Sequence, residues 1–220
     1  HDNYPIAWDL VLILDSSIRW YFFFAVWAAL YVAFGYANEM RAVERQANNY
    51  RLEAKNAKKG LKSGIVIKIN SLEDKEIIDE MYKASKAGVQ IKLIVRGICC
   101  LRPGREDLSE NIFVKSIVGE YLEHSRIYYF HNNGDPKVYG GSADIMVRSF
   151  DRRIEALFLI LNEDLKREAI NILYYNLLDN KNSYIMREDG TYVKKRPAAN
   201  EEIIDIHKIF YNRNINESLE

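Results

Sequence analysis

Residues 64–97, GIVIKINSLEDKEIIDEMYKASKAGVQIKLIVRG, decide the fold of this chain. The apolar run 64–70 predicts a strand, and the run 89–97 predicts a second strand that is buried on both faces. Between them, isoleucine and methionine recur at helical spacing, with Ser71 as a candidate N-cap and Gly88 closing the helix. The stretch therefore predicts a strand, a helix and a strand in succession.

The same alternation continues to the end of the chain. An Asp-Gly pair at 189–190, between two runs rich in β-forming residues, signals a hairpin. The other expected elements are strands at 112–118, 126–131, 137–142 and 152–161, and helices at 163–178 and 201–212. This pattern predicts the α/β class, as a layered fold with a mixed sheet flanked by helices.

The N-terminal segment 1–45 differs in composition from the domain expected over 46–220. Residues 20–37, WYFFFAVWAALYVAFGYA, include no charged residue. As a helix they would span roughly 27 Å, close to the ~30 Å hydrocarbon core of a bilayer. Membrane association through 20–37 is one interpretation, and a helix packed against protein is the other. A third is that the segment is not native to the domain. The polar stretch 44–60 predicts a helix that stops at Gly60.

Composition narrows the classes of partner and site. Lys+Arg and Asp+Glu both number 31 in the 220 residues, so the net charge is zero and no global field favours nucleic acid. Affinity for phosphate must then come from a local basic cluster. The two cysteines, Cys99 and Cys100, are adjacent, which argues against a zinc site and a secreted disulfide framework. We expect no metal site in the chain and a cytoplasmic location, with membrane association as an addition.

Several polar residues stand where predicted strands begin or end. Arg96 ends a strongly apolar strand, and a guanidinium there suits phosphate because its planar fork donates two hydrogen bonds and stays charged. The alternative is an arginine paired with a carboxylate. His124 is followed by Arg126, then a strand, then Ser142 in GGSAD. This order is the layout of the phospholipase D motif, in which histidines transfer a phosphoryl group while basic and hydroxyl groups hold its oxygens.

A further pair stands in the stretch DRRIEALF. Arg153 and Glu155 would share one face of a strand, so that both could look into one pocket, where a carboxylate orients a histidine. A cross-strand ion pair is the alternative. Arg102, in CCLRPG, is interpreted as a solvated group in a turn, and lone histidines such as His131 and His207 as structural.

Long stretches of the chain are specific to one family. These are INSLEDKEIIDEMYKASKAGVQIKLIVRGICCLRPG, LSENIFVKSIVGEYLEHSRIYYFHNNGDPKVY, SADIM and DRRIEALF. From about residue 53 onward the chain resembles the C-terminal, phospholipase D-like domain of bacterial polyphosphate kinases. The resemblance implies transfer of phosphoryl groups between ATP and inorganic polyphosphate, and the reverse transfer to ADP.

The resemblance also implies roles for individual residues. A phosphohistidine forms on a histidine of the preceding domain, while His124 binds the nucleotide phosphates and assists proton transfer. Arg96, Arg126, Ser142 and Arg153 would bind phosphate, and Glu155 would act with His124. Mg²⁺ is implied by the family, with ligands that are not in this chain.

Departures from the family lead to three hypotheses. The domain with the phosphorylated histidine has no counterpart here, Ile145 stands in place of Trp, Ser149 in place of Asn, and GGS in place of a serine pair. The first hypothesis is a kinase half-site that needs the missing kinase domains. The second is a homodimeric phospholipase D-like phosphodiesterase in which a second copy supplies the other histidine. The third is a non-catalytic phosphate-binding module.

Overall fold

The computed structural model describes residues 6–146 and 155–217. Residue contacts divide the chain into two units, residues 1–41 and residues 42–220. Helix α1 (Ile6–Lys58) runs through both of them. It is a single helix where the sequence predicted two separate segments. It ends just before Gly60, whose φ of 71° is readily adopted by glycine.

One mixed sheet organises the second unit, as the sequence predicted. Its eight strands run in the order β6-β5-β4-β1-β2-β3-β7-β8. Strands β1, β2 and β3 are parallel, whereas the other neighbours pair antiparallel. The strands are β1 (Ile65–Ile69), β2 (Ile91–Val95), β3 (Ile112–Ile117), β4 (Ile127–Phe130), β5 (Lys137–Gly141), β6 (Leu157–Leu159), β7 (Ser183–Met186) and β8 (Tyr192–Lys194).

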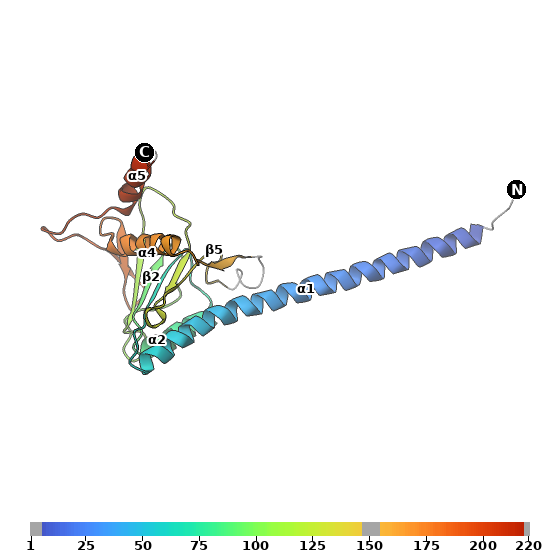
Figure 1. Cartoon of the computed structure of the whole chain (residues 1–220), viewed down its shortest axis with the longest axis horizontal. Coiled ribbons are helices and arrows are strands. Elements are labelled where there is room, and N and C mark those ends of the chain that lie inside the picture. Colours follow the sequence, from blue (N-terminus) through green and yellow to red (C-terminus); the bar gives the residue numbers. More distant parts are fainter. Residues whose placement is uncertain (1–5, 147–154, 218–220) are drawn as a thin grey trace. The chain divides into compact units, whose positions relative to one another are not determined.

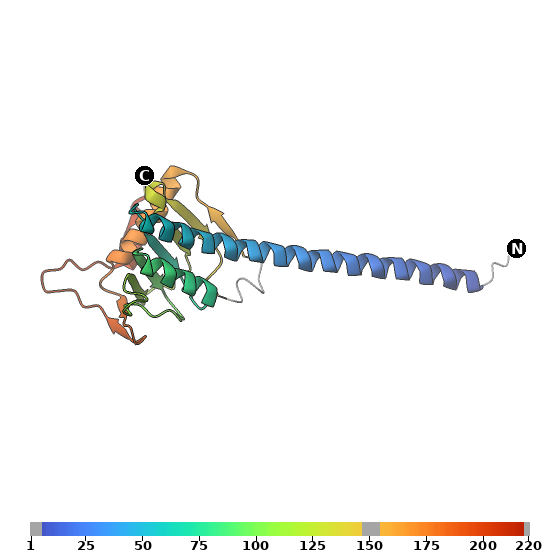
Figure 2. The ribbon, with the colours of Figure 1, turned by 90° about the horizontal axis from the view of Figure 1, so that it is seen from below.

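Helices cover both faces of this sheet. The last turns of α1 and helix α2 (Lys75–Lys86) lie side by side on one face, and α4 (Glu163–Leu178) lies on the other (Figures 1 and 2). The larger core joins Tyr50 of α1 and Met81 of α2 to the inward side chains of the central strands. The smaller core packs Leu173 of α4 against the opposite face. A 3₁₀ turn, η1 (Asn132–Gly134), and helix α5 (Ile206–Glu217) complete the described elements.

Two helices begin later than the sequence predicted. Helix α2 is capped by Asp74, whose carboxylate accepts from the Ile77 N–H at 3.0 Å, and not by Ser71. The reason is that Leu72 is buried and forms bridges to neighbouring segments, which keeps the chain extended up to that point. Helix α5 begins at Ile206, because main-chain groups of the preceding residues are hydrogen-bonded to Asn180.

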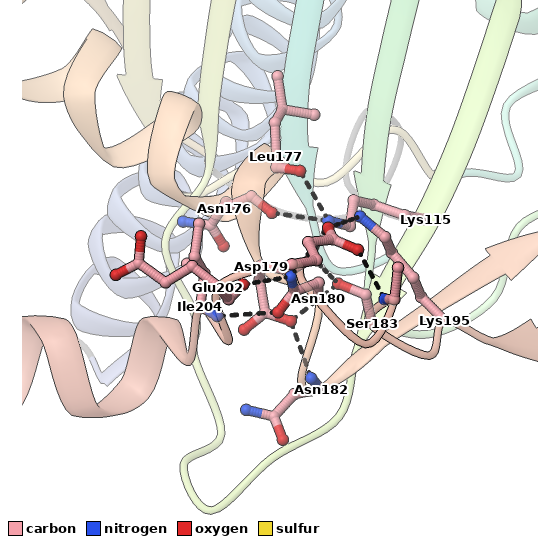
Figure 3. Close-up of polar contacts among 12 residues, drawn as sticks. Lys115, Asn176, Leu177, Asp179, Asn180, Asn182, Ser183, Lys195, Glu202 and Ile204 are labelled. Atoms are coloured by element: carbon pink, nitrogen blue, oxygen red, sulfur yellow. Dashed lines mark hydrogen bonds and ion pairs between the residues drawn. The ribbon is translucent and has the colours of Figure 1, made fainter.

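A buried lysine ties β3 to the C-terminal end of α4 (Figure 3). Lys115 Nζ donates to the main-chain carbonyls of Asn176, Leu177 and Asp179 at 2.9–3.0 Å. Such carbonyls have no partner within the helix, so the ammonium satisfies them. The Asp179 carboxylate accepts from the N–H groups of Asn182 and Ile206 at 2.8 and 3.1 Å. Burial lowers the pKa of Lys115 to about 8, and the charge of Asp179 opposes this shift.

The first unit consists of α1 alone among the described residues. The stretch Leu14–Ala33 is long and apolar enough to cross a membrane, with a mean hydropathy of 1.2 over 20 residues. Its aromatic side chains, such as Phe22 and Trp27, are exposed. Asp15 and Arg19 form an ion pair of 2.8 Å at its N-terminal end.

Candidate functional site

The strand directions bring most of the predicted site residues to one edge of the sheet. The parallel strands β1 and β2 end at this edge, whereas β4 begins there and β5 ends there because each is antiparallel to its neighbour. Open α/β sheets place ligands outside the carboxyl ends of their parallel strands. The predicted residues that flank these strand ends are Arg96 after β2, His124 and Arg126 before β4, and Ser142 after β5.

Arg96 and His124 are in direct contact at this edge. Arg96 Nη2 is 3.3 Å from His124 Nε2, and Arg96 Nη1 donates to the main-chain carbonyl of Glu123 at 2.9 Å. A guanidinium has no acceptor, so His124 Nε2 accepts and the neutral ring carries its proton on Nδ1. His124 is exposed and Arg96 is half-buried. The pair therefore presents unused guanidinium N–H groups and an imidazole to one ligand.

Gly97 allows Arg96 to sit this close to the end of β1. The Gly97 N–H donates to the Asn70 carbonyl at 2.7 Å. A Cβ atom at position 97 would lie 2.9 Å from that same carbonyl oxygen, closer than real Cβ contacts allow. Only glycine therefore fits after Arg96 without separating the ends of the two strands.

Arg126 is held by a partner that sequence reasoning did not name. Its Nε and Nη2 atoms lie 3.0 and 3.1 Å from the two carboxylate oxygens of Asp144, and Nη1 donates to the His124 carbonyl at 3.1 Å. Asp144 also accepts from the Asn70 N–H at 2.8 Å. Burial by itself raises the pKa of the Asp144 carboxyl, but the hydrogen bonds and the Arg126 charge outweigh it, and the pKa is lowered. Arg126 thus braces the main chain of His124.

Glu155 lies beside Ser142, where sequence reasoning placed it beside the histidine. The Ser142 hydroxyl donates to Glu155 Oε2 and accepts from the Ala156 N–H at 3.0 Å. Glu155 precedes β6 and is not part of the strand. Arg153, the other predicted member of this pair, lies outside the described residues, as does Ser149. The described part of the site is thus the pair of Arg96 and His124, with Arg126 and Ser142 nearby, each hydrogen-bonded to a carboxylate.

Three further residues lie behind the pair. Lys68 Nζ is 2.9 Å from Glu123 Oε2, and His207 Nε2 is 3.6 Å from Glu123 Oε1. Together with Arg96 they line a cavity of about 20 Å³, enough for roughly one water molecule. A signal for Lys68 existed in the sequence, because a lysine in the middle of the apolar strand IVIKI needs a buried partner.

Other polar residues have local structural tasks. The Arg102 guanidinium donates to the carbonyls of Cys99 and Leu101 at 3.3 and 3.4 Å, so it stabilises its turn and is not simply solvated, as the sequence suggested. His131 Nδ1 accepts from the Gly134 N–H at 3.1 Å and closes η1. Within residues 6–146 and 155–217, no group of three or more His, Cys, Asp or Glu side chains could hold a metal ion.

Known proteins are similar to this chain in sequence. The family model of the polyphosphate kinase C-terminal domain 2 matches residues 39–205. The chain is 49% identical over 177 residues to a polyphosphate kinase of Synechocystis, covering 80% of this chain and 24% of the relative. It is 50% identical over 146 residues to a polyphosphate kinase of Bacillus cereus, covering 66% of this chain and 21% of the relative.

A solved structure is also similar. The crystal structure of polyphosphate kinase from Porphyromonas gingivalis superposes with a TM-score of 0.75 at 38% identity, covering 79% of this chain and 26% of that chain. The chain thus spans about a quarter of the length of the relatives that it matches. Because the family model covers most of its length, the chain belongs to the family of the polyphosphate kinase C-terminal domain 2.

Proposed function

We propose that residues 42–220 form the half of a polyphosphate kinase site that binds the phosphates of ATP or ADP next to the end of a polyphosphate chain. The observation that carries this proposal is the 3.3 Å contact between Arg96 Nη2 and His124 Nε2 at the exposed sheet edge. Guanidinium binds phosphate oxygens through paired, charge-assisted hydrogen bonds. An imidazole in contact with it can serve as a general acid or base in the transfer.

The chemistry assigns His124 one of two histidine roles. Transfer through a phosphohistidine requires one imidazole to attack phosphorus and another group to protonate the leaving oxygen. Among the described residues, the sheet edge presents His124 together with arginine donors. We assign His124 the second role, in which its ring contacts the phosphates and its Nδ1–H gives the proton to the oxygen of the departing ADP or polyphosphate. A second kinase domain, or a second copy of this chain, would supply the attacking imidazole.

The neighbouring residues support this pair. Arg126 fixes the His124 main chain through its carbonyl, and Glu155 orients the Ser142 hydroxyl at the same edge. We assign Arg126 and Arg153 to the binding of phosphate oxygens, and Ser142 would join them by turning its hydroxyl proton away from Glu155. Mg²⁺ would accompany the nucleotide. Because the described side chains include no cluster that fits this ion, we derive no step through it.

Binding of ATP and polyphosphate by the purified chain tests this proposal. We expect saturable binding of both ligands by isothermal titration calorimetry, with an affinity that falls steeply as salt is added, because arginine–phosphate attraction is screened. We also expect no extension of polyphosphate by the monomer, since one imidazole cannot both attack and protonate.

The alternatives give different results in the same experiments. Absence of ATP and polyphosphate binding at low ionic strength would contradict the proposal. Hydrolysis of a phosphodiester by a dimer of the chain would favour the phosphodiesterase instead. If the chain binds ATP or polyphosphate but no phosphoryl transfer occurs even after the remaining kinase domains are added, the chain is a non-catalytic phosphate-binding module.

We also propose that the helix Leu14–Ala33 lies in a lipid bilayer on a protein that is otherwise cytoplasmic. Its 20 residues would span about 30 Å at ~1.5 Å per residue, which matches the hydrocarbon core. None of this stretch is buried against protein. The exposed aromatic side chain of Tyr31 lies near its C-terminal end, where interfacial anchors are found.

Deletion of residues 1–41 tests this placement. We expect the full chain to float with phosphatidylcholine vesicles in a density gradient and the deletion variant to stay at the bottom. A matched point variant, Phe24→Lys, places a charge mid-helix at a cost of about 2.5–3.5 kcal/mol, and should reduce flotation strongly. The proposed placement of this helix in the bilayer is refuted if the full chain and the deletion variant show the same distribution in the gradient.

A further inference from the structure

The loop of residues 118–125, between β3 and β4, carries His124 and rests on a buried polar pair. Its Glu123 carboxylate lies 2.9 Å from Lys68 Nζ and 3.6 Å from His207 Nε2. The side chains of Lys68 and His207 are only 8% and 3% exposed. Neither the predicted site nor the proposed binding of phosphate accounts for these two buried groups.

The tautomer of the His207 ring follows from its neighbours. The Tyr121 N–H donates to His207 Nδ1 at 3.3 Å, so this nitrogen is an acceptor and carries no proton. The proton of the neutral ring is therefore on Nε2, which faces the Glu123 carboxylate. The Tyr121 ring also packs edge-on against the imidazole, with 5.5 Å between the ring centres. His207 thus holds the loop through the main chain and the ring of Tyr121.

Helix α5 meets the start of the loop as well. A Cβ atom at Gly119 would lie 2.5 Å from His207 Nδ1, so the loop passes too close to the imidazole for any other residue. The preceding Val118 N–H donates to the Asn182 carbonyl at 2.9 Å. The first turn of α5 therefore contacts the loop at alternate residues, Gly119, Tyr121 and Glu123, directly before His124.

We propose that Lys68 and His207 are positioning residues for the phosphate site, Lys68 by pairing with the Glu123 carboxylate and His207 by accepting from the Tyr121 N–H of the same loop. This inference rests on the function proposed above. Glu123 connects the buried Lys68 to the exposed Arg96. Its side chain binds Lys68, and its main-chain carbonyl accepts from Arg96 Nη1 at 2.9 Å. His124 follows it in the chain. Holding one carboxylate therefore sets the place of both the guanidinium and the imidazole.

The energetics favour a firmly held loop. A lysine buried in a strand is costly unless its charge is paired, so Lys68 strongly favours the conformation in which Glu123 reaches it. A loop between strands has few other means of fixing a side chain to the accuracy that phosphoryl transfer needs, and support by buried hydrogen bonds is the general remedy. Removal of the carboxylate leaves Arg96 and His124 in place only part of the time.

Affinity for ATP in variants of the full chain tests the inference. We expect Glu123→Ala and Lys68→Met each to weaken ATP binding by about tenfold, in the range of mutations that act through a ligand-contacting residue. Glu123→Gln keeps an oxygen that can accept from Lys68, and should restore most of the affinity. The matched control is Lys83→Met, which removes a lysine from another 2.9 Å ion pair, on α2, and should change nothing.

The outcomes separate this inference from the proposed function. Glu123→Ala and Lys68→Met variants that bind ATP like the parent, while Arg96→Ala does not, would overturn the inference and leave the function standing. If the parent binds neither ATP nor polyphosphate, the proposed function is contradicted. Amide hydrogen exchange of residues 119–125 then tests whether Glu123 and His207 fix the loop. Faster exchange in Glu123→Ala and His207→Ala supports it, and unchanged exchange refutes it. Should Lys68→Met not fold, the Glu123 variants alone carry the test.

Discussion

Replacing Arg96 by alanine is expected to weaken ATP binding by about 30- to 1,000-fold, since loss of one partner of a charged hydrogen-bonded pair costs about 2–4 kcal/mol. The guanidinium donates to the Glu123 carbonyl and contacts His124 Nε2, so its loss removes both a phosphate ligand and the contact that orients the imidazole. Titration calorimetry at constant salt measures the effect. Arg96→Lys should show an intermediate loss, because it keeps the charge but not the planar fork.

The control for Arg96 is an arginine of equal charge elsewhere. Arg51 on α1 pairs with Glu80 of α2 at 3.2 Å and is largely exposed. Arg51→Ala should therefore leave ATP affinity unchanged while altering the net charge in the same way. If both variants lost affinity equally, the binding would depend on overall charge, and Arg96 would not be part of a site.

Lys115 should make the stability of the fold depend on alkaline pH. Its pKa is about 8 in the folded chain, because of burial, and about 10.5 when unfolded. Between these values the unfolded chain binds the proton and the folded chain does not, so the free energy of unfolding rises with pH across this window. The contribution is about 1.4 kcal/mol per pH unit and roughly 3 kcal/mol in all. Below pH 8 both states are protonated, so the cost of burying the ammonium is present in full and the free energy of unfolding no longer changes with pH through this group.

Urea denaturation of the parent and of Lys115→Met at pH 8, 9 and 10 measures this effect. The stability of the parent relative to the variant should increase at each step. Tyrosine and cysteine groups that titrate in the same range are common to both proteins and cancel in the difference. A parent–variant difference that does not change with pH would show that the ammonium is not penalised by burial.

The layered fold could be predicted from the sequence because its signals are local. Apolar runs of strand length alternate with amphipathic runs, and Asp189-Gly190 lies between β7 and β8. The start of α2 could not be predicted in this way. Ser71 and Asp74 are both good N-caps, and the choice between them is made by Leu72, which is drawn into bridges with Cys99 and Ile145.

The site was predictable in part for the same reason. Arg96 and His124 could be recognised because they are polar residues that flank apolar strands. The structure brings them together. The partners of the other polar groups depend on chain crossings that no local pattern encodes. Asp144 reaches Arg126 because β4 and β5 pair. Lys68 and His207 reach Glu123 from elements that lie far from it in the chain.

A ligand that binds Arg96 has to replace the contact between its guanidinium and His124. The guanidinium directs one donor to a neutral nitrogen, which is a far weaker acceptor than an anionic oxygen. A doubly charged phosphate group forms a stronger hydrogen bond with the guanidinium than His124 Nε2 does, whereas the neutral oxygens of a sugar or an amide form one of similar strength. The pair therefore selects ligands by negative charge before their shape contributes to the selection.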